Sequence, residues 1–273
     1  YTVEELKRGR TPSPDIFCNE RIKFGAFLDA VDSAAERVAT GHYAVLERDG
    51  ENRVWMRRSP DPVKDQSYFL FHLSQRQLQR ALFPIGSMKK EEVRRRAQEL
   101  ELPNKRRPDS QGICFLGKIK YPEFVRYYLG EKEGEIVEKE SGTVLGAHPG
   151  SWFYTIGQRQ GLGLGNGPWY VVGKSFEENV VYVSHARSAE SHSRRTIRIG
   201  ELTWLTEAPR SEELLVKLRH GPELTPARVR RVESEPAEEM EVGLAEADRG
   251  VAPGQFAVLY DGEYCLGGGT ILE

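Results

Sequence analysis

Cysteine is scarce in this sequence, with three residues in a chain of 273. Cys18, Cys114 and Cys265 form no CxxC pair and no Cys/His set with the spacing of a zinc site, so we expect no bound metal. An odd and sparse count also argues against a secreted disulfide scaffold and for a reducing compartment. Any reactivity of a thiol must therefore come from its local setting.

Long apolar runs are also missing. No stretch of about 18 apolar residues occurs, so we expect no membrane-spanning helix and no membrane partner. The mean hydropathy is -0.56 and 29% of the residues are charged, which is typical of a globular protein in water. Tyr1 stands first, with neither an initiator Met nor a signal-like or transit-like segment, and we expect the sequence to be cut from a longer protein.

A strong charge of one sign is the third absence. The formal net charge is -2 and the pI is about 6.4, so a uniformly basic surface is excluded. Basic residues nevertheless form clusters, namely "RRR" at 94–96, "KRR" at 105–107, "RR" at 194–195 and "RVRR" at 228–231. Such clusters either contact nucleic-acid phosphates or form solvated helix faces, and the sequence alone leaves both interpretations open.

The apolar pattern divides the chain into three parts. Up to about residue 118, amphipathic helical patterns alternate with short strand patterns, as in α/β proteins. From Gly134 onward, short β-like runs are separated by Gly, Pro and Asn turns. We predict an α/β domain over 1–118, a small central β-rich domain over 119–191 and a C-terminal antiparallel β-barrel or sandwich over 192–273.

Three helix starts are predicted within the first part. A helix beginning near Arg21 would place Phe24 and Leu28 on its apolar face. Ser74 is predicted to cap the segment "QRQLQRAL", and Ser87 to cap "KKEEVRRRAQEL", whose apolar face would be formed by Val93, Ala97 and Leu100.

Two of the three thiols lie in settings that favour reactivity. Cys18 follows Asp15 by three residues in "GRTPSPDIFCNE" and precedes the predicted helix, whose free N–H groups would stabilise a thiolate. Asp15 could serve as an acid or base toward a substrate. Cys114 lies in "RPDSQGICFLG", flanked by glycines and preceded by cations. Exchange between the two thiols is one interpretation, and buried structural cysteines are the other; Cys265, in a strand-like run, is predicted to be structural.

Two other segments have polar residues with open roles. Lys64, Asp65 and Gln66 in "PVKDQSYF" suit phosphate or base-edge contacts, or equally a capped turn. His42 in "ATGHY" is either a contact residue or a satisfied core histidine. The glycines of "GQRQGLGLGNGPW" do not have the G-x-G-x-x-G spacing and favour a turn between strands over a nucleotide loop.

Taken together, seven motifs resemble those of the tRNA-specific 2-thiouridylases. In the family's order they are "GRTPSPDIFCNERIKFGAF", "ATGHYA", "KDQSYFL", "DSQGICFLG", "YTIGQRQGLGLG", "WYVVGK" and "APGQFAVLYDGEYCLGGGTI", and they extend from Gly9 to Ile271. The resemblance implies the remainder of an adenine-nucleotide-hydrolase-like (PP-loop) domain, then a central β-rich domain and a C-terminal antiparallel β-barrel. The family's SGGxDS-type ATP loop does not occur here, so only the C-terminal part of the PP-loop domain is expected, and ATP activation by this chain alone is in question.

The resemblance also implies an activity. The family uses ATP, with Mg²⁺ expected, to adenylate the C2 oxygen of the wobble uridine of tRNA, and then transfers persulfide sulfur to C2. Expected partners are tRNAs for Glu, Gln and Lys and a cysteine desulfurase or sulfur-relay protein. A monomer in the cytoplasm, or in an organelle of a eukaryote, is expected.

Site residues follow from the same resemblance. Cys114 matches the persulfide carrier, and Cys18 matches the nucleophile that releases the sulfur and can end in a disulfide with Cys114. Asp15 matches the acid that contacts the target base, with Ser13 and Pro14 beside it. Gly41 is similar to an ATP-contacting glycine. The positions similar to tRNA contacts are His42, Lys64, Asp65, Gln66, Gln255, Arg219 and His220, the last standing where a tyrosine is usual.

Two other function classes stay open on the sequence alone. In a noncatalytic RNA-binding module the cysteines would be incidental, and serine would replace them without effect. In a thiol redox protein Cys18 and Cys114 would cycle as a disulfide without any dependence on tRNA.

Overall fold

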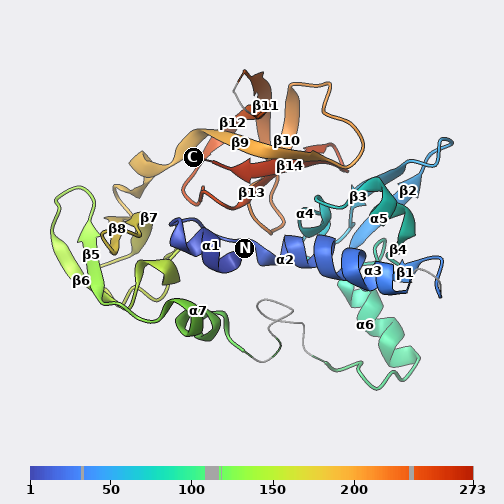
Figure 1. Ribbon diagram of the computed structural model, residues 1–273, viewed down its shortest axis with the longest axis horizontal. Helices are drawn as coiled ribbons and strands as arrows, with labels where there is room; N and C mark the ends of the chain where they lie inside the picture. Colours follow the sequence, from blue (N-terminus) through green and yellow to red (C-terminus); the bar gives the residue numbers. More distant parts are fainter. Residues whose placement is uncertain (32–33, 108–116, 118, 234–236, 273) are drawn as a thin grey trace.

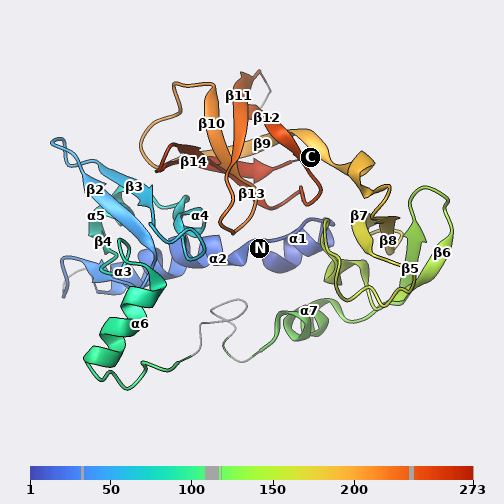
Figure 2. The same ribbon diagram turned by 180° about the vertical axis from the view of Figure 1, so that it is seen from behind.

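The computed structural model describes residues 1–31, 34–107, 117, 119–233 and 237–272. Figure 1 shows an N-terminal helical segment along the middle of the molecule, a small sheet at one end and a barrel on one side. Figure 2 shows the same arrangement from behind. No helix within the described ranges is long and apolar enough to cross a membrane.

The N-terminal part is mostly helical. Its helices are α1 (Thr2–Lys7), α2 (Pro14–Phe17), the π-helix η1 (Cys18–Ala26), α3 (Phe27–Ala30), α4 (Ser67–Leu70), α5 (Gln75–Arg80) and α6 (Lys90–Glu99). Its strands are the parallel pair β1 (Val38–Ala39) and β4 (Ala81–Leu82), and the antiparallel pair β2 (Ala44–Arg48) and β3 (Val54–Arg58).

The helical segment of the first motif begins earlier than predicted. It starts at Pro14, because proline has the φ angle of a helix and its missing N–H costs nothing in the first turn. The segment then continues through η1 and α3, so the predicted start near Arg21 is wrong. The backbone N–H of Cys18 bonds to the carbonyl of Pro14, and no free helix N-terminus lies at this thiol. The apolar face is confirmed by the burial of Phe24 and Leu28.

Of the two predicted serine caps, one is confirmed. Ser74 and Gln77 form a reciprocal capping box at the start of α5. Ser87 does not cap α6, whose N-cap is Lys89 without a side-chain hydrogen bond. The predicted apolar face of α6 is also not buried, and Leu100 just beyond its end is 70% exposed.

The central domain is a helix followed by a four-stranded sheet. Its elements are α7 (Tyr121–Leu129), β5 (Gly134–Glu138), β6 (Val144–His148), the 3-10 helix η3 (Ser151–Phe153), β7 (Trp169–Ser175), β8 (Val180–His185) and the 3-10 helix η4 (Ala189–His192). The strand order is β6-β5-β8-β7, with β5 and β8 parallel. The glycine-rich segment between η3 and β7 contains no helix or strand, as predicted, and Leu162 within it packs into the core of the sheet.

The C-terminal domain is a closed antiparallel barrel. Its strands are β9 (Arg194–Trp204), β10 (Glu213–Lys217), β11 (Thr225–Val232), β12 (Glu239–Asp248), β13 (Phe256–Asp261) and β14 (Tyr264–Ile271). The order β13-β10-β11-β12-β9-β14 is closed by pairing of β13 with β14. Alternating residues of these strands fill the interior, as expected for a small barrel.

The N-terminal part and the barrel share a sheet and a core. Strand β3 pairs with β14, so that Met56 lies opposite Cys265 and the β2–β3 hairpin extends the barrel sheet. Ile16 and Phe24 belong to the same buried cluster as Tyr260. Cys265 is 2% exposed, and burial raises the pKa of its thiol, which fits the predicted structural role.

Candidate active site

A cleft of about 300 Å³ lies where the N-terminal part meets the central domain. Ser13, Pro14 and Asp15, predicted to contact the target base, all line it. The opposite wall comes from the central domain and includes Trp152 and Lys174. The structure therefore groups the three predicted residues at one concave site.

The loop before α2 is held in place by the barrel. The backbone N–H of Thr11 donates to the carbonyl of Pro253 at 2.8 Å. Gly254 has φ +88°, and a Cβ there would lie 2.7 Å from the Cβ of Arg10, so this close approach requires glycine. Gln255, a predicted tRNA contact, is the next residue of the same barrel loop.

Cys18 lies one helical turn after Asp15. The three-residue spacing places both residues on neighbouring positions of one helix face. Asp15 lines the cleft, whereas Cys18 does not and is 7% exposed with a free thiol. Cys114 lies outside the described residues. Exchange between Cys18 and Cys114 therefore stays a prediction.

A second cavity, of about 560 Å³, lies between α6 and the loops that follow β1 and β3. It brings together Gly41, the predicted ATP contact, and the predicted tRNA contacts Lys64, Gln66 and His220. Further cations of its lining come from α6 and the turn after it, namely Lys90, Arg94, Lys105 and Arg107. A concentration of cations of this kind suits phosphate groups.

Asp65 has a different position from its neighbours in the sequence. Its side chain is 0% exposed and accepts a hydrogen bond from Lys217 Nζ at 2.6 Å. It also accepts hydrogen bonds from the backbone N–H of Ser59 and the hydroxyl of Ser67. The bond to Lys217 joins the N-terminal part to β10. A structural role fits this buried position of Asp65, and its contact with tRNA stays a prediction.

His42 lies in the core. It is 7% exposed, packs against the rings of Phe24 and Phe83, and its Nδ1 lies 2.7 Å from Thr40 Oγ1. Burial, with a smaller effect of the Lys23 charge, lowers the pKa of His42 to about 4. Of the two interpretations left open, the satisfied core histidine fits this geometry, and contact with tRNA stays a prediction.

Arg219 and His220 follow β10 and are both exposed. Arg219 forms an ion pair with Asp248. His220 packs on Phe69 with ring centroids 4.8 Å apart, and partial burial, with a smaller effect of the Lys217 charge, lowers its pKa. Both side chains are accessible to a ligand, and His220 lines the second cavity.

Two lysines near the predicted site residues were given no role from the sequence. Lys217 is fully buried in the pair with Asp65, and no local pattern marks its distant partner. Lys174 ends the quoted motif "WYVVGK" but carried no predicted role. Its place in the cleft could not be predicted from the sequence, because Lys174 lies in β7 and the other lining residues come from distant segments, among them α1, α2 and α7.

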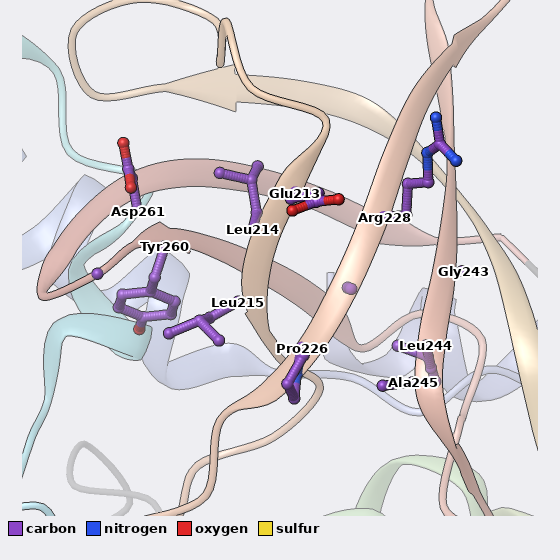
Figure 3. A pocket seen from close by; sticks show the side chains of 12 residues that line it. Glu213, Leu214, Leu215, Pro226, Arg228, Gly243, Leu244, Ala245, Tyr260 and Asp261 are labelled. Carbon is purple, nitrogen blue, oxygen red and sulfur yellow. The ribbon is translucent and has the colours of Figure 1, made fainter.

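Figure 3 shows the side chains that line a third cavity, which is formed by residues of β10, β11, β12 and β13 and the turn after β13. Its volume is about 480 Å³. It is lined mainly by apolar side chains, among them Leu214, Leu215 and Pro226, and none of the predicted site residues borders it. Within the described part of the chain, no group of three or more His, Cys, Asp or Glu residues is placed to hold a metal ion.

Three segments match families of known domains. Residues 1–118 match the tRNA methyl transferase HUP domain, residues 122–185 the tRNA methyl transferase PRC-barrel domain, and residues 194–271 the aminomethyltransferase beta-barrel domain. The protein is thus of the class that joins a HUP domain, a small central domain and a C-terminal closed barrel, and the predicted fold class is confirmed.

Similar whole proteins narrow this class. The tRNA-specific 2-thiouridylase MnmA of Parabacteroides distasonis is 45% identical over 281 residues, which cover 100% of this chain and 77% of the relative. MnmA 2 of Bacteroides fragilis is 45% identical over 278 residues, 99% of this chain and 77% of the relative. MnmA of Porphyromonas gingivalis is 42% identical over 284 residues, with 100% and 77% covered. The chain belongs to the tRNA-specific 2-thiouridylase family.

Proposed function

We propose that this protein is a tRNA-uridine 2-sulfurtransferase that acts on the wobble uridine of tRNA. One observation carries the proposal, namely that Ser13, Pro14 and Asp15 line one cleft with Cys18 a helical turn away. A base in that cleft would be within reach of an acid, and the thiol lies on the same helical segment. Family membership supports the same reaction class.

The proposed chemistry has three balanced steps. The C2 oxygen of uracil attacks the α-phosphate of ATP, and pyrophosphate leaves. Cys18 attacks the inner sulfur of a persulfide on Cys114, which forms the Cys18–Cys114 disulfide and releases hydrosulfide. Hydrosulfide attacks C2, and AMP leaves with the former uracil oxygen. Asp15 would hold or move the proton of the base at this stage.

Nucleotide binding is proposed for the second cavity. Gly41 leaves open space there, since a Cβ at this position would meet only one atom within 4 Å, the Cδ1 of Ile85, at 3.9 Å. The cations of the lining fit a polyphosphate, and Mg²⁺ would be carried with it. Lys105 and Arg107 would bind oxygens of such a group or of the RNA backbone.

The partner proposed for the cleft at Asp15 is the anticodon region of tRNA, whose backbone would also contact the cations of the second cavity beside the nucleotide. Atom C2 of uridine cannot be reached in a stacked base, so the nucleotide must leave the stack and enter a pocket. Loops of RNA allow this at low cost. A persulfide-donating protein must load Cys114, and tRNAs for Glu, Gln and Lys, a monomeric protein and a cytoplasmic setting remain part of the proposal.

A thiolation assay tests the function. Unmodified glutamate or lysine tRNA is incubated with the protein, ATP, Mg²⁺ and a cysteine desulfurase with cysteine as the persulfide donor, and 2-thiouridine is measured by mass spectrometry of the nucleosides. We expect product that requires ATP and is abolished by Cys18→Ser, while the matched control Cys265→Ser keeps activity. Equal product from Cys18→Ser would contradict the role of this thiol. Tight tRNA binding with no product from the unchanged protein, and still none once a segment with the SGGxDS-type loop is joined upstream, would favour a noncatalytic RNA-binding module.

A further inference from the structure

Lys174 has an unusual setting in the cleft that contains Asp15. It comes from β7 of the central domain, and its Nζ donates to the backbone carbonyl of Tyr154 at 3.0 Å. Among the described residues, no carboxylate lies within 4.0 Å of this ammonium. Burial alone lowers the pKa of Lys174 to about 8. A desolvated cation without a counter-charge favours an anionic ligand.

If the anionic ligand is the phosphate of a nucleotide, the rest of the cleft suits its base. Trp152 and Phe153 of η3 and Tyr121 of α7 supply aromatic rings, on which a nucleobase can stack. Its volume of about 300 Å³ is at the lower end of the range of small-molecule sites. Asp15 and Tyr121 are the other titratable groups of the lining, and burial raises the pKa of Tyr121 to about 12.

We propose that Lys174 binds a backbone phosphate next to the flipped uridine, whose base lies between Asp15 and the aromatic wall of Trp152 and Phe153. This inference rests on the proposed function and adds a positioning residue to it. The central domain would then hold the phosphate while the N-terminal part acts on the base. A nucleotide held at two points from two domains is fixed in orientation, which is what an in-line attack requires.

The test is a thermodynamic cycle between one side chain and one phosphate. The probe is an anticodon stem-loop RNA, either unmodified or with neutral methylphosphonate linkages on both sides of the target uridine, and affinity is measured by fluorescence anisotropy. We expect the unchanged protein to lose roughly tenfold in affinity when the linkages are neutral. Lys174→Met should lose about as much with the unmodified RNA and nothing further with the neutral RNA. The control Lys132→Met, at an exposed lysine of the same domain, should keep the full discrimination.

Two further readouts separate binding from a structural role. Because the Lys174 ammonium loses its proton around its pKa of about 8, and loss of the charge costs roughly tenfold, affinity for the unmodified RNA should fall roughly threefold from pH 7 to pH 8.5. Lys174→Arg should keep its affinity over this range, since arginine stays charged. Lys174→Met should also unfold at an equal or higher temperature than the unchanged protein, because it removes a desolvated charge.

The outcomes are distinguishable. Independent effects of Lys174→Met and of the neutral linkages would overturn the proposal, as would a lowered unfolding temperature with equal loss of affinity for both RNAs. Failure of the unchanged protein to bind either stem-loop would overturn the proposed function, and the phosphate site with it. Tight binding of the unmodified RNA by Lys174→Met would overturn the phosphate site alone.

Discussion

At the scale of single residues, burial decides which predicted contacts can act directly. His42 and Asp65 are buried. Lys64 and Gln66, the sequence neighbours of Asp65, line the second cavity instead. A sequence motif shows which residue types are present, but it does not show whether their side chains are exposed to solvent or to a ligand. Cys18 illustrates the same limit, because its thiol is buried although its motif indicates reactivity.

The buried His42 predicts acid sensitivity. The folded-state pKa of about 4 lies below the ordinary value of 6.5, so the unfolded chain binds the proton more tightly. Stability from this group is therefore complete above pH 6.5 and falls as the pH drops toward 4, by roughly 2–3 kcal/mol at pH 4.5. Urea unfolding at pH 7.5 and 4.5 should show this loss in the unchanged protein and a smaller one in His42→Gln. Equal losses in both proteins would contradict it.

At the scale of secondary-structure elements, the sequence predicts some local features correctly, such as the cap at Ser74, but not the cap at Ser87 or the pairings between distant elements. The capping box at Ser74 depends on a partner three residues away, and the sequence contains both residues. The pairing of β3 with β14 joins Met56 and Cys265, which no local pattern connects. The helix of the first motif is predicted to start too late, because Ile16 in its first turn already belongs to the buried face that continues with Phe24.

The buried pair of Asp65 and Lys217 links α4 and its preceding loop to β10. Removing one partner leaves a buried charge unpaired, so Asp65→Ala should lower the free energy of unfolding by roughly 3–5 kcal/mol. The double variant with Lys217→Met should be more stable than the sum of the two single losses predicts, by at least about 1 kcal/mol. Urea unfolding at pH 7 measures the cycle. Strict additivity would show that the two groups do not interact.

The basic lining after α6 makes a separate prediction for RNA binding. If Lys105 and Arg107 contact phosphates, Lys105→Gln and Arg107→Gln should each weaken tRNA binding and reduce the slope of log affinity against log salt by about 1. Arg230→Gln, on the barrel in a pair with Glu241, serves as the control and should leave the slope unchanged. Equal slopes in all four proteins would remove this cavity from the RNA surface.

At the scale of the whole molecule, the parts of the site come from different domains. The cleft at Asp15 combines the N-terminal part with the central domain, and the second cavity combines α6 with His220 of the barrel. The order of the three domains was predictable from the change in apolar pattern and from the motifs. Their packing was not, because the shared core and the Asp65–Lys217 pair depend on residues more than a hundred positions apart.

The most direct test of the account follows one sulfur atom. Cys114 is loaded with a radiolabelled persulfide, unbound label is removed, and ATP, Mg²⁺ and unmodified tRNA are added for a single turnover. The account predicts labelled 2-thiouridine together with a disulfide between Cys18 and Cys114, and neither product in Cys18→Ser. A disulfide that forms without tRNA, with the label recovered only as free sulfide when tRNA and ATP are present, would contradict sulfur transfer and indicate a thiol redox protein.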